Sequence, residues 1–150
     1  MKTIFRSIPI GVPNKNGRIY PEDMMRKAIE EYNTIPNKQL GQLNHPDNAS
    51  DIVSLKNATH SIKSVKLKAL KVPRKMKKEM KKNGTYSNAK QMSVEIKYYP
   101  AAQKIKEILH ELVLGPSMEA VLNSDGSPNV KRIISFNFIP KKDSAFKKYL

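Results

Sequence analysis

The order of its secondary-structure patterns most constrains the fold of this chain. Short segments with alternating or β-branched residues are separated by turn signals such as Asn-Gly and Asp-Gly. Strands are predicted at 3–12, within 51–72 (one strand or two), and at 90–99, 117–123 and 129–140. Helices are predicted at 21–35 and 101–114, and turns at 13–18 and 123–128. The basic segment 73–84 is expected to be helical or mobile, and Asn83-Gly84 ends it.

This order of a strand, a helix, several strands, a second helix and a final strand pair predicts an α+β fold. We expect a mainly antiparallel sheet or barrel with flanking helices. A Rossmann fold is excluded because the sequence has neither a glycine fingerprint nor a βαβ rhythm. With 150 residues, no internal repeat and no long linker, residues 1–150 are expected to form a single domain.

The charge balance is strongly basic: 28 Lys and Arg face 13 Asp and Glu, a net charge of +15. Residues 71–84 contain seven basic residues and one Glu, which indicates a basic insertion, and residues 141–150 form a basic tail. A polyanionic neighbour is therefore favoured, either nucleic acid or an acidic protein surface. Neither segment has the interleaved aromatic residues of a single-strand-binding platform, so a solvated basic surface is the simplest interpretation.

Other site classes are excluded by what the sequence lacks. Without cysteine there is no disulfide framework or thiolate zinc site, and a reducing compartment such as the cytoplasm fits. There is no Walker motif, H-E-x-x-H motif or calcium loop, so no cofactor or metal is expected. We also expect no signal peptide and no membrane partner, because no apolar run is long enough.

Three histidines are candidates for a catalytic base. His110 falls in the predicted helix 101–114 and is interpreted as structural or surface, whereas His60 falls in a predicted strand. His45 lies beside a proline in a loop rich in turn residues, and loops on rigid scaffolds often carry function.

Ser117 is the candidate nucleophile. It follows Gly115-Pro116, where the predicted helix ends and a strand begins. A tight turn at that point would expose the hydroxyl and direct a backbone N–H toward an oxyanion. Ordinary helix termination by Gly and Pro is the alternative interpretation.

Four segments resemble the prohead proteases of tailed bacteriophages, which share the herpesvirus assemblin-type serine-protease fold. They are "NKNGRIYP" (14–21), "GQLNHP" (41–46), "NATHSIKSVKLK" (57–68) and "YYPAAQKIKEILHELVLGPSMEAV" (98–121). The resemblance spans roughly residues 3–140. It implies a serine endopeptidase in which His45 is the general base and Ser117 the nucleophile.

The sequence departs from that family at two positions. Glu119 stands where the family commonly has an Arg that assists the oxyanion, and Arg132 on the next predicted strand is the candidate replacement. Asn137 stands where the family often has Asp, and is the best match for the third catalytic residue. His60 is the alternative third residue, and Asp47 is a more distant candidate.

The resemblance also implies the biological setting. The expected partners are phage scaffold or core proteins and the major capsid protein, inside a prohead assembled in the host cytoplasm. Homo-oligomers and non-specific contact with nucleic acid through residues 71–84 stay open. The alternative function is a catalytically degenerate protease fold that acts as a structural or scaffold-associated capsid component. A basic nucleic-acid-binding protein is a third hypothesis, based on charge alone.

Overall fold

The computed structural model describes residues 2–35, 39–45, 53–54, 56–86 and 89–150. Its strands are β1 (Lys2–Ile10), β2 (Gln39–Gly41), β3 (His60–Ala69), β4 (Lys90–Tyr98), β5 (Leu112–Leu122) and β6 (Pro128–Pro140). Its helices are α1 (Glu22–Asn33), α2 (Arg74–Lys82) and the 3₁₀ segments η1 (Pro100–Glu111), η2 (Lys141–Asp143) and η3 (Lys147–Tyr149).

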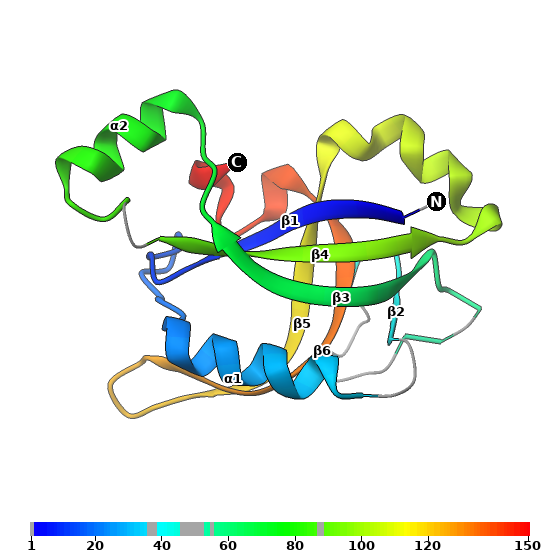
Figure 1. Ribbon diagram of the computed structural model, residues 1–150, viewed down its shortest axis with the longest axis horizontal. Helices are drawn as coiled ribbons and strands as arrows, with labels where there is room; N and C mark the ends of the chain where they lie inside the picture. Colours follow the sequence, from blue (N-terminus) through cyan, green and yellow to red (C-terminus); the bar gives the residue numbers. More distant parts are fainter. Residues whose placement is uncertain (1, 36–38, 46–52, 55, 87–88) are drawn as a thin grey trace.

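The strands form two antiparallel sheets. One has the order β1-β4-β3-β2, and the other is the β5-β6 pair. Figure 1 shows β5 and β6 running across the four-stranded sheet, with α1 beside β6 and α2 extending from one end. The expected α+β architecture with a mainly antiparallel sheet is therefore confirmed.

The core lies where the two sheets face each other. Alternate residues of β4, such as Met92, Val94 and Ile96, are fully buried and pack with Phe136 and Phe138 of β6. This alternation is the period of two that a strand requires when one of its faces is buried. The cross-packing fixes β6, which carries several polar residues of the candidate site, against the rigid four-stranded sheet.

Most predicted elements are confirmed, including α1 after Pro21 and the turn closed by Gly126 (φ 84°). Residues 51–72 contain a single described strand, β3, whereas β2 was not predicted because three residues carry no readable periodicity. The basic segment forms α2 and ends at Asn83-Gly84, as expected. The basic tail is not merely solvated, because its Phe146 and Tyr149 are buried in the core.

The prediction of a helix over 101–114 is wrong in type and in its end. A 3₁₀ segment ends at Glu111, and Leu112–Leu114 already belong to β5, opposite Ile139 and its neighbours in β6. Ser117 consequently lies within a strand rather than at a helix-to-strand turn. The physical reason is that a short apolar run suits a helix stripe and a buried strand equally, and here pairing with β6 decides.

Candidate active site

Backbone hydrogen bonds hold the segment that carries His45 against the edge of β6 that does not pair with β5. Phe138 donates its N–H to the Gln42 carbonyl at 2.9 Å, and Asn44 donates its N–H to the Phe138 carbonyl at 2.7 Å. Asn44 has φ 66°, a left-handed conformation that Asn adopts more readily than most residues. These bonds hold the backbone immediately before His45 beside β6.

His45 and Ser117 meet although they are 72 positions apart. The distance between His45 Nδ1 and Ser117 Oγ is 3.0 Å, within hydrogen-bond range. Ser117 lies on β5, directly opposite Ser135 of β6. Only 3% of the surface of Ser117 is exposed. His45 is exposed as a residue, but partial burial of its ring still lowers its pKa below the ordinary 6.5. The ring is therefore favoured in its neutral form, the form that can accept a proton.

The fully buried side-chain amide of Asn137 joins the two residues. Its Oδ1 accepts the Gln42 N–H at 2.9 Å, and because a backbone N–H can only donate, this bond fixes the orientation of the amide. Nδ2 then lies 2.9 Å from Ser117 Oγ, 3.2 Å from Ser135 Oγ and 3.1 Å from His45 Nδ1.

The donor count selects one arrangement of hydrogens. Nδ2 of Asn137 has two hydrogens for three neighbouring acceptors, and a neutral imidazole Nδ1 offers a single lone pair. If the amide serves the oxygens of Ser117 and Ser135, the lone pair of His45 Nδ1 is left for the Ser117 hydroxyl. Both amide hydrogens of Asn137 and the hydroxyl hydrogen of Ser117 then have an acceptor, and the Ser117 proton points at a base.

His60, the alternative third residue, is directed elsewhere. It is fully buried, and its Nε2 bonds the Phe136 carbonyl at 2.8 Å while Nδ1 bonds Thr59 Oγ1 at 2.9 Å. The carbonyl can only accept, so Nε2 carries the hydrogen and Nδ1 accepts from the threonine hydroxyl. Burial lowers its pKa to about 4, partly offset by the bond to Phe136. His60 thus ties β3 to β6 one residue before Asn137.

The remaining predicted residues lie apart from the cluster. Arg132 Nε donates to Glu119 Oε2 at 2.7 Å on the exposed side of the β5-β6 pair. The two opposite charges therefore neutralise each other. The structure therefore pairs the candidate oxyanion cation with the carboxylate that it was expected to offset. His110 is exposed, and Asp47 lies outside the described residues. Within the described part of the chain, no group of three or more His, Asp or Glu could hold a metal ion.

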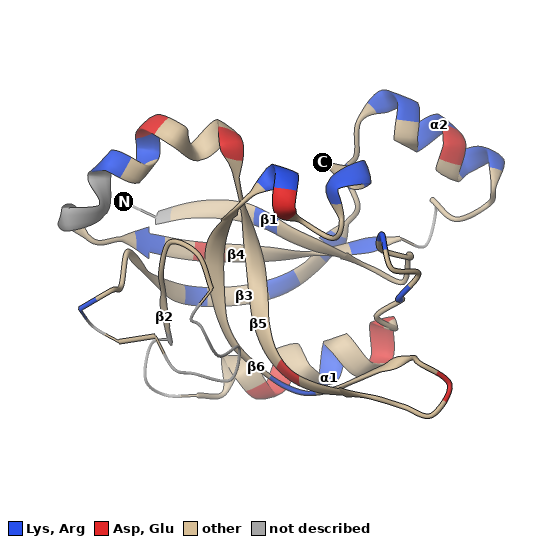
Figure 2. Cartoon of the chain, turned by 180° about the vertical axis from the view of Figure 1, so that it is seen from behind, with Lys and Arg blue, Asp and Glu red and all other residues tan. Residues whose placement is uncertain are grey.

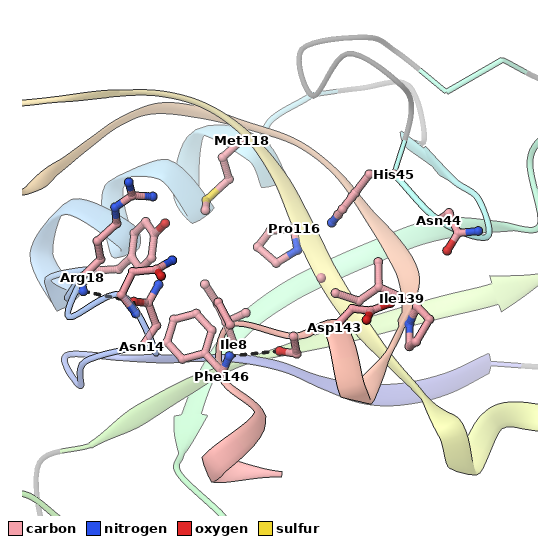
Figure 3. Close-up of a pocket in the computed structure, with 16 residues that line it drawn as sticks. Ile8, Asn14, Arg18, Asn44, His45, Pro116, Met118, Ile139, Asp143 and Phe146 are labelled. Carbon is pink, nitrogen blue, oxygen red and sulfur yellow. Dashed lines mark hydrogen bonds between the residues drawn. The ribbon is translucent and has the colours of Figure 1, made fainter.

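A groove of about 440 Å³ opens beside the cluster. His45, Gly115 and Pro116 line it, and it extends toward Asn14 and Arg18 in the turn after β1 (Figure 3). Gly115, Pro116 and Met118 place the groove along β5, whereas Ser117 itself is 3% exposed and is not one of the lining residues. Among the described helices, none is long and apolar enough to cross a membrane.

Sequence reasoning missed Ser135 and the Gln42 N–H. Ser135 could have been found from the sequence, because residues two apart in a strand share a face and Ser135 therefore lies on the same face as Asn137. The Gln42 N–H had no such signal, because the pairing of the 42–44 segment with β6 is a tertiary contact.

Comparison with known proteins identifies the fold. The structure is similar to that of the bacteriophage T4 capsid assembly protease gp21, with a TM-score of 0.52 and 17% sequence identity. The match covers 93% of this chain and 76% of that one. No protein-family description matches the sequence, and no curated protein is significantly similar to it. The chain thus has the fold of a phage capsid assembly protease, as the resemblance implied; its assemblin-like character stays a prediction.

Proposed function

We propose that this protein is a serine endopeptidase of phage head maturation. The observation that carries the proposal is the 3.0 Å contact between His45 Nδ1 and Ser117 Oγ, with Asn137 holding the oxygen from a second side. The similarity to a capsid assembly protease supports the same conclusion independently, since it compares whole folds and not these side chains.

In the proposed reaction, Ser117 Oγ attacks the carbonyl carbon of a substrate peptide bond. His45 Nδ1 takes the hydroxyl proton as the new C–O bond forms. The imidazolium returns that proton to the amine nitrogen as the C–N bond breaks, leaving an acyl-enzyme on Ser117. Water then attacks the ester with His45 again as base, which releases the acid and restores the hydroxyl.

Asn137 serves this reaction differently from the aspartate of a serine-protease triad. An aspartate accepts a hydrogen from the far nitrogen of the imidazole and stabilises its charge. Asn137 instead lies on the near side and donates to Ser117 Oγ, which holds the attacking oxygen in place. We therefore assign it as a positioning donor for the nucleophile, and the neutral His45 works with a lowered pKa.

The proposed substrates are the scaffold or core proteins and the major capsid protein of the phage that encodes this chain. The setting would be the prohead interior, assembled in the host cytoplasm. The fold similarity supports this assignment because the neighbouring structure is described as a capsid assembly protease. A peptide segment of such a protein would lie in the groove along β5.

The test is incubation of the purified protein with those core and capsid proteins, followed by mass spectrometry of the fragments. We expect defined cleavage that Ser117→Ala abolishes. Ser135→Ala is the matched control, because it removes the neighbouring serine hydroxyl and one bond to Asn137 but not the nucleophile. Unchanged substrate with the wild-type protein would instead favour the non-catalytic capsid component.

A further inference from the structure

Two adjoining grooves lie on the β1-β4-β3 sheet. Their volumes are about 460 and 400 Å³, and Arg6, Lys71 and Gln91 line both. The first groove also includes Lys68 of β3, and the second reaches Leu112 at the start of β5. None of the described residues lining either groove is Asp or Glu. The grooves therefore form one cationic surface, which we call the Gln91 surface.

Gln91 is a buried polar residue whose side-chain amide uses only one of its two ends within the protein. It is 3% exposed, and its Oε1 accepts the Lys71 N–H at 2.8 Å, which fixes the amide orientation. The amide nitrogen Nε2 has no hydrogen-bond acceptor among the described residues, although it is not sealed away from solvent. A buried amide with an unused donor at a groove between cations suits a bound anion.

Arg6 and Lys68 stand on either side of this donor. Arg6 pairs in register with Ser93, two residues along β4 from Gln91, and Lys68 lies directly opposite Gln91 on β3. Both side chains are exposed. The nearest acidic residue of that strand face, Glu95, lies four positions beyond Gln91. Figure 2 shows that Lys and Arg also gather on α2, with one acidic residue among them.

The same surface also offers apolar contact. Ile4, which lines the first groove, is 68% exposed, and Val72 and Leu112 line the second. A phosphate backbone gains nothing from aliphatic side chains, whereas an acidic peptide with apolar residues can use both. The mixture therefore favours a protein ligand over DNA.

We propose that the Gln91 surface binds an acidic, partly aliphatic segment of another protein. A carboxylate of that segment accepts from Gln91 Nε2 between Arg6 and Lys68, and its aliphatic residues cover Ile4. This site is separate from Ser117 and does not depend on the proposed protease activity.

The experiment measures the affinity of a labelled peptide of alternating Glu and Leu by fluorescence anisotropy at physiological salt. Gln91→Glu keeps the acceptor for the Lys71 N–H but replaces the free donor with a negative charge. We expect it to weaken binding by roughly tenfold or more. Lys68→Gln, a surface change that does not threaten folding, is expected to weaken binding by roughly threefold to tenfold.

Lys27→Gln, at an exposed position of α1, is the charge-matched control and should leave the affinity within about twofold. Ser117→Ala should also bind normally, so failure of either proposal leaves the other intact. If Gln91→Glu and the wild type bound the Glu-Leu peptide with equal affinity, the assignment of Gln91 to the binding site would be wrong. Tighter binding of a short duplex DNA than of the Glu-Leu peptide would overturn the choice of a protein ligand, and no binding of either probe would overturn the proposal as a whole.

Discussion

The amide of Asn137 contacts both partners of the proposed catalytic pair. It donates toward Ser117 Oγ, lies 3.1 Å from His45 Nδ1, and is itself oriented by the Gln42 N–H. A carboxylate could accept the same Gln42 bond but could not donate to Ser117. The identity of this residue therefore determines the environment of the nucleophile.

Asn137→Asp tests that role through the pH profile. A carboxylate beside Nδ1 would stabilise the imidazolium and raise the pKa of His45, which burial lowers in the wild type. Because the base must be neutral, we expect the acidic limb of the kcat/KM profile to move upward by roughly one to two pH units. Asn129→Asp, the same change elsewhere on β6, should leave the limb in place. An unshifted limb in Asn137→Asp would contradict the assignment.

Arg132→Ala tests the oxyanion assignment made from sequence. Its guanidinium bonds Glu119 on the exposed side of the β5-β6 pair, and such pairs are worth about 0–1 kcal/mol. We expect kcat/KM to stay within about twofold, whereas loss of an oxyanion donor costs roughly a hundredfold or more. A loss of that size in steady-state kinetics would restore Arg132 to the reaction.

At the scale of the elements, the junction of β2, β3 and β6 positions the site. Gly41 of β2 lies against His60 and β6 so closely that an added Cβ would collide with His60 Nε2 and the Phe136 carbonyl. The next residue donates the N–H that orients Asn137. A side chain at position 41 would therefore disturb both the packing and the site.

Gly41→Ala should lower the free energy of unfolding by about 3 kcal/mol, because neither backbone nor a buried ring can move aside cheaply. Gly17→Ala is the control: its Cβ would meet nothing, and only its positive φ of 76° costs about 1 kcal/mol. Urea unfolding of both variants measures the difference. Equal losses would show that the close approach at Gly41 carries no strain.

The sequence supported some elements better than others for physical reasons. The pattern in 90–99 identified β4, whose buried face repeats every second residue from 92 to 98, whereas residues 133–138 of β6 are buried without a break. The start of β5 was misread because Leu112–Leu114 fit a helix stripe as well. The proximity of His45 to Ser117 came from a family resemblance, whereas the near-side position of Asn137 depends on tertiary contacts that no local pattern encodes.

At the scale of the whole molecule, buried His60 couples folding to pH. Its pKa is about 4 in the folded chain and near 6.5 when exposed, so the unfolded chain binds more protons between these values. The contribution of neutral His60 to the free energy of unfolding is therefore fully present above pH 6.5. It is lost as the pH drops toward 4, by about 3 kcal/mol in total.

His60→Gln removes this titration, so urea unfolding from pH 7 to pH 4 should show a shallower loss of stability than in the wild type. His110→Gln changes an exposed histidine and should reproduce the wild-type slope. Equal slopes in the wild type and His60→Gln would show that His60 does not set the acid sensitivity of the fold.

The central claim is that His45 activates Ser117 as a nucleophile, and covalent labelling tests it without knowledge of the substrate. The protein is treated with a fluorophosphonate, and the modified residue is located by peptide mass spectrometry. We predict a single adduct on Ser117 that is lost in His45→Ala and retained in Ser135→Ala. An unlabelled Ser117 in the wild-type protein, or labelling that persists at the same rate in His45→Ala, would contradict the account.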